Sequence, residues 1–188
     1  MPANPAPLGL GGFGLTTLVL SMVNSNLVSV TAQPVVLGMA FAFGGLAQLL
    51  AGMWEFRSGN TFGAVAFSSF GAFWISFFIL VQFDAALLHP LTAGSALGLY
   101  LWAWGIFTGL LFLCTFTSPR ALSLLFLLLT LTFIFLGIGA SGGSNGTTHI
   151  GGFIGIATAA VALYIMTADI MKSTYGRTVL PVGDPAGE

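Results

Sequence analysis

The chain has 188 residues, of which 56% are hydrophobic and 5% are charged, with a mean hydropathy of +1.01 and a formal net charge of −1. A surface this poor in charge belongs in lipid, which excludes a water-soluble globular protein. The net charge argues against a nucleic-acid partner, because binding to phosphates requires a basic patch. A spanning helix needs roughly 20 mostly apolar residues, so six spans nearly fill the chain and leave no room for a soluble catalytic domain.

The first residues are polar and rich in proline. No basic n-region of a cleavable signal peptide precedes them, so we expect the mature protein to retain them. Pro5 and Pro7 do not suit a helix interior but suit a turn or a helix start. We therefore expect residues 1–9 to form a separate N-terminal segment, which lies at the interface or dips into the protein.

Hydropathy predicts an all-α integral membrane bundle over residues 10–171, within a single membrane domain of residues 1–188. A polar tail that contains proline and glycine, residues 172–188, follows on the cytoplasmic surface. The expected spans are Leu10–Val23, Val35–Phe56, Thr61–Phe83, Ala93–Phe116, Ala121–Ala140 and Thr147–Met171.

The positions of the basic residues predict the orientation of these spans. Each of Arg57, Arg120, Lys172 and Arg177 follows an even-numbered span, and no other Lys or Arg occurs. Cations are retained on the cytoplasmic side, so both termini are expected inside. The chain is thus expected to be a multi-pass protein of the inner, cytoplasmic membrane.

Glycine pairs spaced by four residues, such as Gly151 and Gly155, favour close helix packing.

The sequence offers little for catalysis. An enzyme needs an activated nucleophile, a metal cluster or paired acid and base groups. His89 and His149 are isolated near outer loops, so we expect no metal and no cofactor. Glu55 lies near the cytoplasmic end of the second span, where it is either a proton carrier or a rim residue paired with Arg57. We keep Glu55 and His149 as candidates for proton coupling.

Polar, uncharged side chains within the apolar spans are the candidates for a substrate path. Each hydroxyl can bond to its own helix, which is the simplest explanation. Several that face one cavity could instead replace water around a carboxylate, aided by helix N-termini, which favour anions. The candidates are Asn4, Thr16, Thr17, Gln48, Asn60, Thr61, Ser69 and Thr130. Phe13 and Phe70 adjoin glycines in such spans and either pack or form a hydrophobic constriction.

Several collinear motifs resemble the acetate uptake transporter family, which includes the bacterial succinate–acetate permeases. The first is Asn4-Pro5-Ala6-Pro7-Leu8-Gly9-Leu10, which matches the signature heptapeptide of that family. The others are Gly12-Phe13-Gly14, Thr16-Thr17, Gly44-Gly45, Ala47-Gln48, Gly59-Asn60-Thr61-Phe62-Gly63, Phe70-Gly71 with Trp74, His149, and Gly176-Arg177-Thr178-Val179-Leu180-Pro181. The resemblance spans nearly the whole chain.

This resemblance implies a six-helix protomer, a homohexamer and an acetate pathway through each protomer. It also implies a hydrophobic constriction formed by Phe13, Phe70 and Leu129, and an essential role for the Asn4–Leu10 motif. Phe70 stands where related sequences often have tyrosine. The missing hydroxyl makes the neck drier, which leaves open whether the more polar succinate passes as readily as acetate.

The leading hypothesis is therefore an inner-membrane transporter or channel for small carboxylates, chiefly acetate, with succinate as a second candidate. The alternative is a channel for small neutral solutes, since Asn4-Pro5-Ala6 superficially matches the aquaporin triplet. Aquaporins use two such copies on half-helices, whereas this chain has one at its start. An integral-membrane enzyme is a third class, which lacks a nucleophile or metal set here. Channel and proton symport both stay open.

Overall fold

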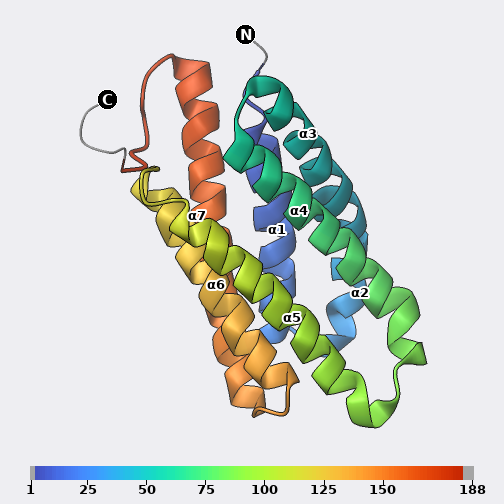
Figure 1. Ribbon diagram of the computed structural model, residues 1–188. Coiled ribbons are helices and arrows are strands. Elements are labelled where there is room, and N and C mark those ends of the chain that lie inside the picture. The colour runs from blue at the N-terminus through green and yellow to red at the C-terminus, as the bar shows by residue number, and fades with distance from the viewer. Residues whose placement is uncertain (1–2, 184–188) are drawn as a thin grey trace.

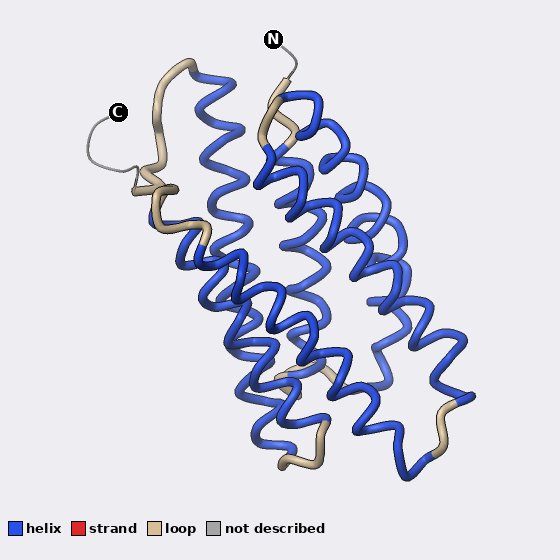
Figure 2. The backbone as a smooth tube through the Cα atoms, viewed as in Figure 1, coloured by secondary structure: helices blue, strands red, loops and turns tan. Residues whose placement is uncertain are grey.

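The computed structural model describes residues 3–183, apart from the side chains of residues 85, 90 and 91. Its elements are α1 (Ala6–Asn24), η1 (Val30–Ala32), α2 (Gln33–Phe41), η2 (Ala42–Ala47), α3 (Gln48–Ser58), α4 (Thr61–Ile79), η3 (Leu80–Asp84), η4 (Ala85–Leu87), α5 (Pro90–Leu113), α6 (Arg120–Ala140) and α7 (Asn145–Tyr175). Figure 2 shows helices throughout, joined by short loops, and the described residues contain no strand. The all-helical prediction is confirmed.

Six helical stretches are long and apolar enough to span a membrane, as expected. The second stretch, Val30–Ser58, joins η1, α2, η2 and α3 into one interrupted span. Successive spans alternate in direction, so α1, α4 and α6 run one way and the others run the opposite way (Figure 1). Both ends of the chain lie at one end of the bundle, which we call the terminal end; the opposite end is the far end.

The N-terminal segment is shorter than expected, because α1 begins at Ala6 rather than at Leu10. Pro7 lies in the first turn of α1, where its missing N–H costs no hydrogen bond and its fixed φ suits the helix. The last helix is also longer than expected. It continues to Tyr175 and ends at Gly176, whose φ of 67° closes the helix in the left-handed conformation.

The second span contains a π-helix, η2, which sequence periodicity does not predict. A π-helical turn inserts extra backbone into an α-helix and is often found at functional sites. Here it brings Gly44 against α1, where an added Cβ would lie 2.7 Å from the Thr16 hydroxyl oxygen. The same turn leads directly into Gln48, the first residue of α3.

The C-terminal tail is bound to the start of α6 rather than lying free on the surface. The backbone N–H groups of Arg120 and Ala121 donate to the carbonyls of Gly183 and Val182, at 2.9 and 3.0 Å. The Tyr164 hydroxyl donates to the carbonyl of Pro181 at 2.8 Å. The tail thereby satisfies donors of the first turn of α6, which a helix start otherwise leaves unpaired.

Candidate functional site

Two cavities lie within the bundle. The first, about 190 Å³, is lined mainly by α1, α4 and α6 with residues of α3, α7 and the tail, and it reaches Ala6 and Asn60 near the terminal end. The second, about 250 Å³, is lined by α1, α4, α5 and α6 and reaches Asn24 and Thr148 near the far end. We call them the terminal-side cavity and the far-side cavity.

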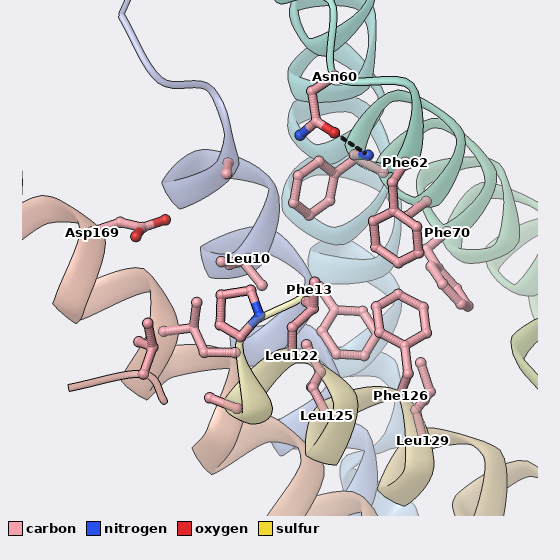
Figure 3. A pocket seen from close by; sticks show the side chains of 18 of the residues that line it. Leu10, Phe13, Asn60, Phe62, Phe70, Leu122, Leu125, Phe126, Leu129 and Asp169 are labelled. Carbon is pink, nitrogen blue, oxygen red and sulfur yellow. Dashed lines mark hydrogen bonds between the residues drawn. The ribbon is translucent and has the colours of Figure 1, made fainter. Parts of the chain in front are cut away.

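The two cavities meet at a neck of apolar side chains. Phe13 and Leu129 line both cavities, and Phe70 lines the terminal-side cavity. The rings of Phe13 and Phe70 are in contact, with centroids 5.8 Å apart, and all three side chains are buried. Figure 3 shows Phe13, Phe70 and Leu129 converging from three helices. The structure thus brings together the three residues that the resemblance assigns to a constriction.

The three neck residues form a single layer of side chains because their helices run in the same direction. Phe13, Phe70 and Leu129 lie on α1, α4 and α6, which run in parallel, so residues one turn along each helix form the next layer. The next layer toward the terminal end is apolar and lines the terminal-side cavity; it consists of Leu10, Ala66 and Leu125. The next layer toward the far end contains polar atoms and lines the far-side cavity; it includes Thr17, Trp74 and Thr132.

Three of the eight expected polar residues line a cavity. Gln48 and Asn60 line the terminal-side cavity and Thr17 lines the far-side cavity. Gln48 is 1% exposed, and its Oε1 has no hydrogen-bond partner among the described residues. Gln48 is therefore an amide held in a largely apolar wall, with a buried carbonyl oxygen that the described residues leave without a hydrogen bond.

Asn60 joins the end of α3 to the start of α4. Gly59 adopts a φ of 80° and closes α3, and the Asn60 side chain then caps α4 by accepting from the Gly63 N–H at 3.1 Å. The Asn60 Nδ2 donates to Glu55 Oε2 at 2.9 Å. Asn60 thus caps α4, and Glu55 is bound to Asn60 rather than to Arg57, which is exposed.

The other five expected polar residues lie outside the described walls of both cavities, each for a local reason. Asn4 and Thr61 are exposed, and Ser69 is half-buried on α4. Thr16 packs against Gly44. The Thr130 hydroxyl donates to the Phe126 carbonyl at 2.7 Å. Asn4 accepts from the Ala6 N–H at 3.0 Å, so its side chain supports the start of α1. The structure does not bring these five side chains to the path.

The two candidates for proton coupling lie at opposite ends of the bundle. Glu55 is 2% exposed at the terminal end, and its Oε1 has no partner among the described residues. Asp169 of α7 lines the terminal-side cavity. His149 is half-buried in the first turn of α7 and lines a polar hollow at the far end with Asn24 and Asn26.

Sequence reasoning does not assign Trp74 to a cavity, because Trp74 enters only as part of a motif. Thr132 is one of the hydroxyls in apolar spans that sequence reasoning considers for a substrate path, and it lines the far-side cavity. Helical spacing could have found both, because Trp74 follows Phe70 by four residues and Thr132 follows Leu129 by three.

Comparison with known proteins assigns the family. The model of the GPR1/FUN34/yaaH family matches residues 1–184. The chain belongs to this family. It is 38% identical over 182 residues to the succinate-acetate/proton symporter SatP of Escherichia coli K12, covering 97% of this chain and 96% of that protein. It is 43% identical to acetate permease A of Emericella nidulans, covering 96% of this chain and 65% of the permease.

A solved structure shares this fold. The structure of the bacterial acetate channel SatP superposes with a TM-score of 0.91 at 38% identity, covering 97% of this chain and all of that chain. The two SatP names differ in one respect, since one describes a symporter and the other a channel.

Proposed function

We propose that this chain is an inner-membrane transporter for small carboxylates, chiefly acetate, and that each protomer contains its own pathway. The observation that carries the proposal is the row of two cavities that meet at Phe13 and Leu129, with Phe70 beside them. A carboxylate entering from the terminal side passes Asn60 and Gln48, crosses the neck and reaches Thr17. The family to which the chain belongs supports this reading, because it includes relatives named as a succinate-acetate/proton symporter and an acetate permease.

The neck accounts for selection by size and polarity. Its three side chains carry no polar atom, so a charged or strongly hydrated solute crosses it only when the neck opens or when a proton neutralises the solute. Acetate has one carboxylate and one methyl group, whereas succinate has two carboxylates. We therefore propose that acetate passes more readily than succinate through a neck that has Phe70.

We further propose that the protein works as a transporter and not as an enzyme, with both termini in the cytoplasm and six protomers in the assembly. Arg57, Arg120, Lys172 and Arg177 all lie at the terminal end of the bundle, which favours its placement in the cytoplasm. Large apolar side chains are exposed along every span of the isolated chain. Lipid and neighbouring protomers are the surroundings that suit such a surface.

Acetate flux into proteoliposomes at neutral pH tests the proposal. About 4.3 is typical for the pKa of a carboxyl group, so leakage of the neutral acid is small at neutral pH. We expect saturable acetate uptake, with little uptake of glycerol and no acceleration of water flow. Glycerol or water flux without acetate flux would instead identify a channel for neutral solutes.

Separating voltage from the pH gradient in the same vesicles distinguishes the two transport mechanisms. A potassium ionophore sets the voltage while the pH on each side is varied independently. Flux that follows voltage without proton movement identifies an anion channel. Flux that follows the pH gradient, with protons crossing alongside acetate, identifies a symporter and directs the search for the proton path to Glu55, Asp169 and His149.

A further inference from the structure

The far-side cavity contains two buried polar atoms that have no hydrogen-bond partner in the described part of the chain. They are the hydroxyl oxygen of Thr17 and the indole nitrogen of Trp74, on side chains that are 5% and 2% exposed. A buried donor left without an acceptor costs free energy, and such groups are rare in folded proteins. Each therefore needs a physical explanation.

Thr17 differs from several other helical threonines in this chain. Five of them donate to the carbonyl four residues earlier, at 2.7 to 2.9 Å: Thr108, Thr130, Thr132, Thr158 and Thr167. This local bond is the usual way in which a helix satisfies such a hydroxyl. The Thr17 hydroxyl does not make it. Thr16 does not make it either, but Thr16 faces Gly44, whereas Thr17 faces the cavity.

Aromatic rings lie beside the buried indole of Trp74. Phe73 and Phe77 lie beside it, with ring centroids at 5.0 and 6.0 Å and steep interplanar angles. The indole N–H is a donor only, and a contact with a ring is much weaker than a hydrogen bond to oxygen. Aromatic packing therefore explains the burial of Trp74 but not the unpaired N–H.

The two donors occupy equivalent positions relative to the neck. Thr17 lies one turn beyond Phe13 on α1, and Trp74 lies one turn beyond Phe70 on α4. Phe13 and Phe70 are in contact and their helices run in parallel, so the next turns bring Thr17 and Trp74 to the same level of one cavity. One turn before the neck, the corresponding residues Leu10 and Ala66 are apolar.

We propose that Thr17 and Trp74 form a carboxylate-binding subsite on the far side of the neck. The inference rests on the proposed function and assigns the first polar site that a carboxylate meets after crossing the neck. One carboxylate oxygen accepts from the Thr17 hydroxyl and the other accepts from the Trp74 indole N–H. The alkyl group then faces the apolar side chains of Phe73 and Phe133, which line the same cavity.

The subsite suits transport because it binds without a fixed positive charge. The wall described for this cavity contains no Lys, Arg or His, so two neutral donors supply the attraction. Thr132 shares the wall, but its hydroxyl already donates to the Leu128 carbonyl at 2.9 Å. An anion held by two neutral hydrogen bonds is released more easily than one held by an ion pair, and conduction requires such release.

Binding at this subsite requires a conformation in which both donors are exposed. Water does not reach the Thr17 hydroxyl oxygen or the Trp74 nitrogen in the conformation of this structure. This conformation therefore leaves two donors unpaired, and an open conformation in which a carboxylate reaches them gains both hydrogen bonds. A carboxylate that binds the open conformation better shifts the population toward it.

The indole N–H signal of Trp74 gives a direct test of the subsite. The ¹⁵N-labelled protein is placed in lipid bilayers, and the signal is identified by its loss in the Trp74→Phe variant. Acetate is then titrated against sodium chloride at matched ionic strength. We expect a saturable downfield shift of the Trp74 proton with acetate, no such shift with chloride, and no acetate-dependent shift of the exposed Trp54.

Flux measurements on matched variants complete the test. We expect Trp74→Phe and Thr17→Val each to raise the acetate concentration for half-maximal flux about tenfold, because each removes one hydrogen bond to a charged group. Thr17→Ser retains the hydroxyl and should restore the wild-type value. Thr108→Val is the control, since its buried hydroxyl bonds to Trp104 of its own helix, and Trp54→Phe is the second control.

The outcomes separate this subsite from the proposed function. An indole signal that does not respond to acetate while wild-type acetate flux is normal would overturn the subsite and leave the transport function standing. A saturable shift without acetate flux would retain the subsite and overturn the transport function. Unchanged half-saturation in both variants would also overturn the subsite, whatever the spectra show.

Discussion

Phe70 forms part of the neck with a ring that contacts aromatic side chains from three other helices. Its centroid lies 5.8 Å from Phe13, 6.0 Å from both Trp104 and Phe107, and 6.3 Å from Phe126. Such contacts fix the ring without any hydrogen bond. The width of the neck therefore depends on the size of this one side chain more than on a polar interaction.

Shortening Phe70 should widen the neck. We expect Phe70→Ala to raise the flux of larger monocarboxylates such as butyrate, relative to acetate, by severalfold, because the removed ring leaves space between the two cavities. The measurement is competition of each carboxylate for acetate uptake in proteoliposomes. Because truncation of a buried phenylalanine costs about 3–5 kcal/mol of stability, Phe70→Leu serves as a milder second variant.

Phe153→Ala is the matched control for this prediction, because Phe153 is exposed on α7 and lies outside the described walls of both central cavities. Unchanged uptake and selectivity in both Phe70 variants would remove Phe70 from the neck.

Adjacent hydroxyls show why part of the site was not predictable. Thr16 and Thr17 have the same chemistry, and successive residues of a helix point about 100° apart, so one faces Gly44 and the other faces the far-side cavity. Sequence alone does not tell which is which, because both neighbouring faces are apolar. The residues of the neck were predicted from motifs of the family, since their apolar character also fits simple packing.

At the scale of elements, the contact of the interrupted second span with α4 depends on Gly71. A Cβ at this position would lie 2.7 Å from the Leu49 backbone nitrogen and 2.9 Å from the Gly45 carbonyl oxygen. Both neighbours are backbone atoms, which cannot rotate away as a side chain can. The close approach of α4 to the second span therefore requires glycine at position 71.

We expect Gly71→Ala to destabilise the protein by about 1–3 kcal/mol, as overpacking of a close interface usually does. Gly38→Ala is the control, because nothing lies within 4 Å of the Cβ that it adds in α2. Alanine favours helix over glycine, so this control should be neutral or slightly stabilising. Thermal unfolding of the purified protein in detergent measures both, and equal midpoints for the two variants would contradict the prediction.

The spans were predictable because long apolar runs have few alternatives in a membrane. The interruption of the second span was not, because Gly44 and Gly45 in a helical run also fit ordinary close packing. The start of α1 was placed too late for a related reason: Pro7 indicates either a turn or a first helical turn, and only the fold shows the latter. Contacts of the tail with α6 are long-range and leave no local signal.

At the scale of the whole molecule, the charges lie almost entirely at the ends of the bundle. Arg57, Arg120, Lys172 and Arg177 all lie at the terminal end, where α3, α7 and the tail end and α6 begins. The middle of the bundle presents apolar side chains around its circumference. This distribution determines how deep the protein lies in the membrane and favours one orientation over the other.

Chemical labelling of single cysteines tests this orientation. In a Cys114→Ala background, we expect Ser144→Cys, in the exposed loop before α7, to react with a membrane-impermeant maleimide in intact cells. Ser173→Cys, exposed near the end of α7, should react only after the membrane is permeabilised. The opposite pattern would place the basic end outside and contradict the predicted topology.

The parallel direction of α1, α4 and α6 has an electrical consequence. Each helix carries a macrodipole that is positive at its N-terminus, and these three N-termini all lie at the terminal end while their C-termini lie at the far end. The antiparallel helices α3, α5 and α7 carry the opposite dipole, so the fields of the two sets largely cancel along the bundle. What differs between the two mouths is local: the first-turn backbone N–H groups of α1, α4 and α6 lie at the terminal end, and their last-turn carbonyls lie at the far end.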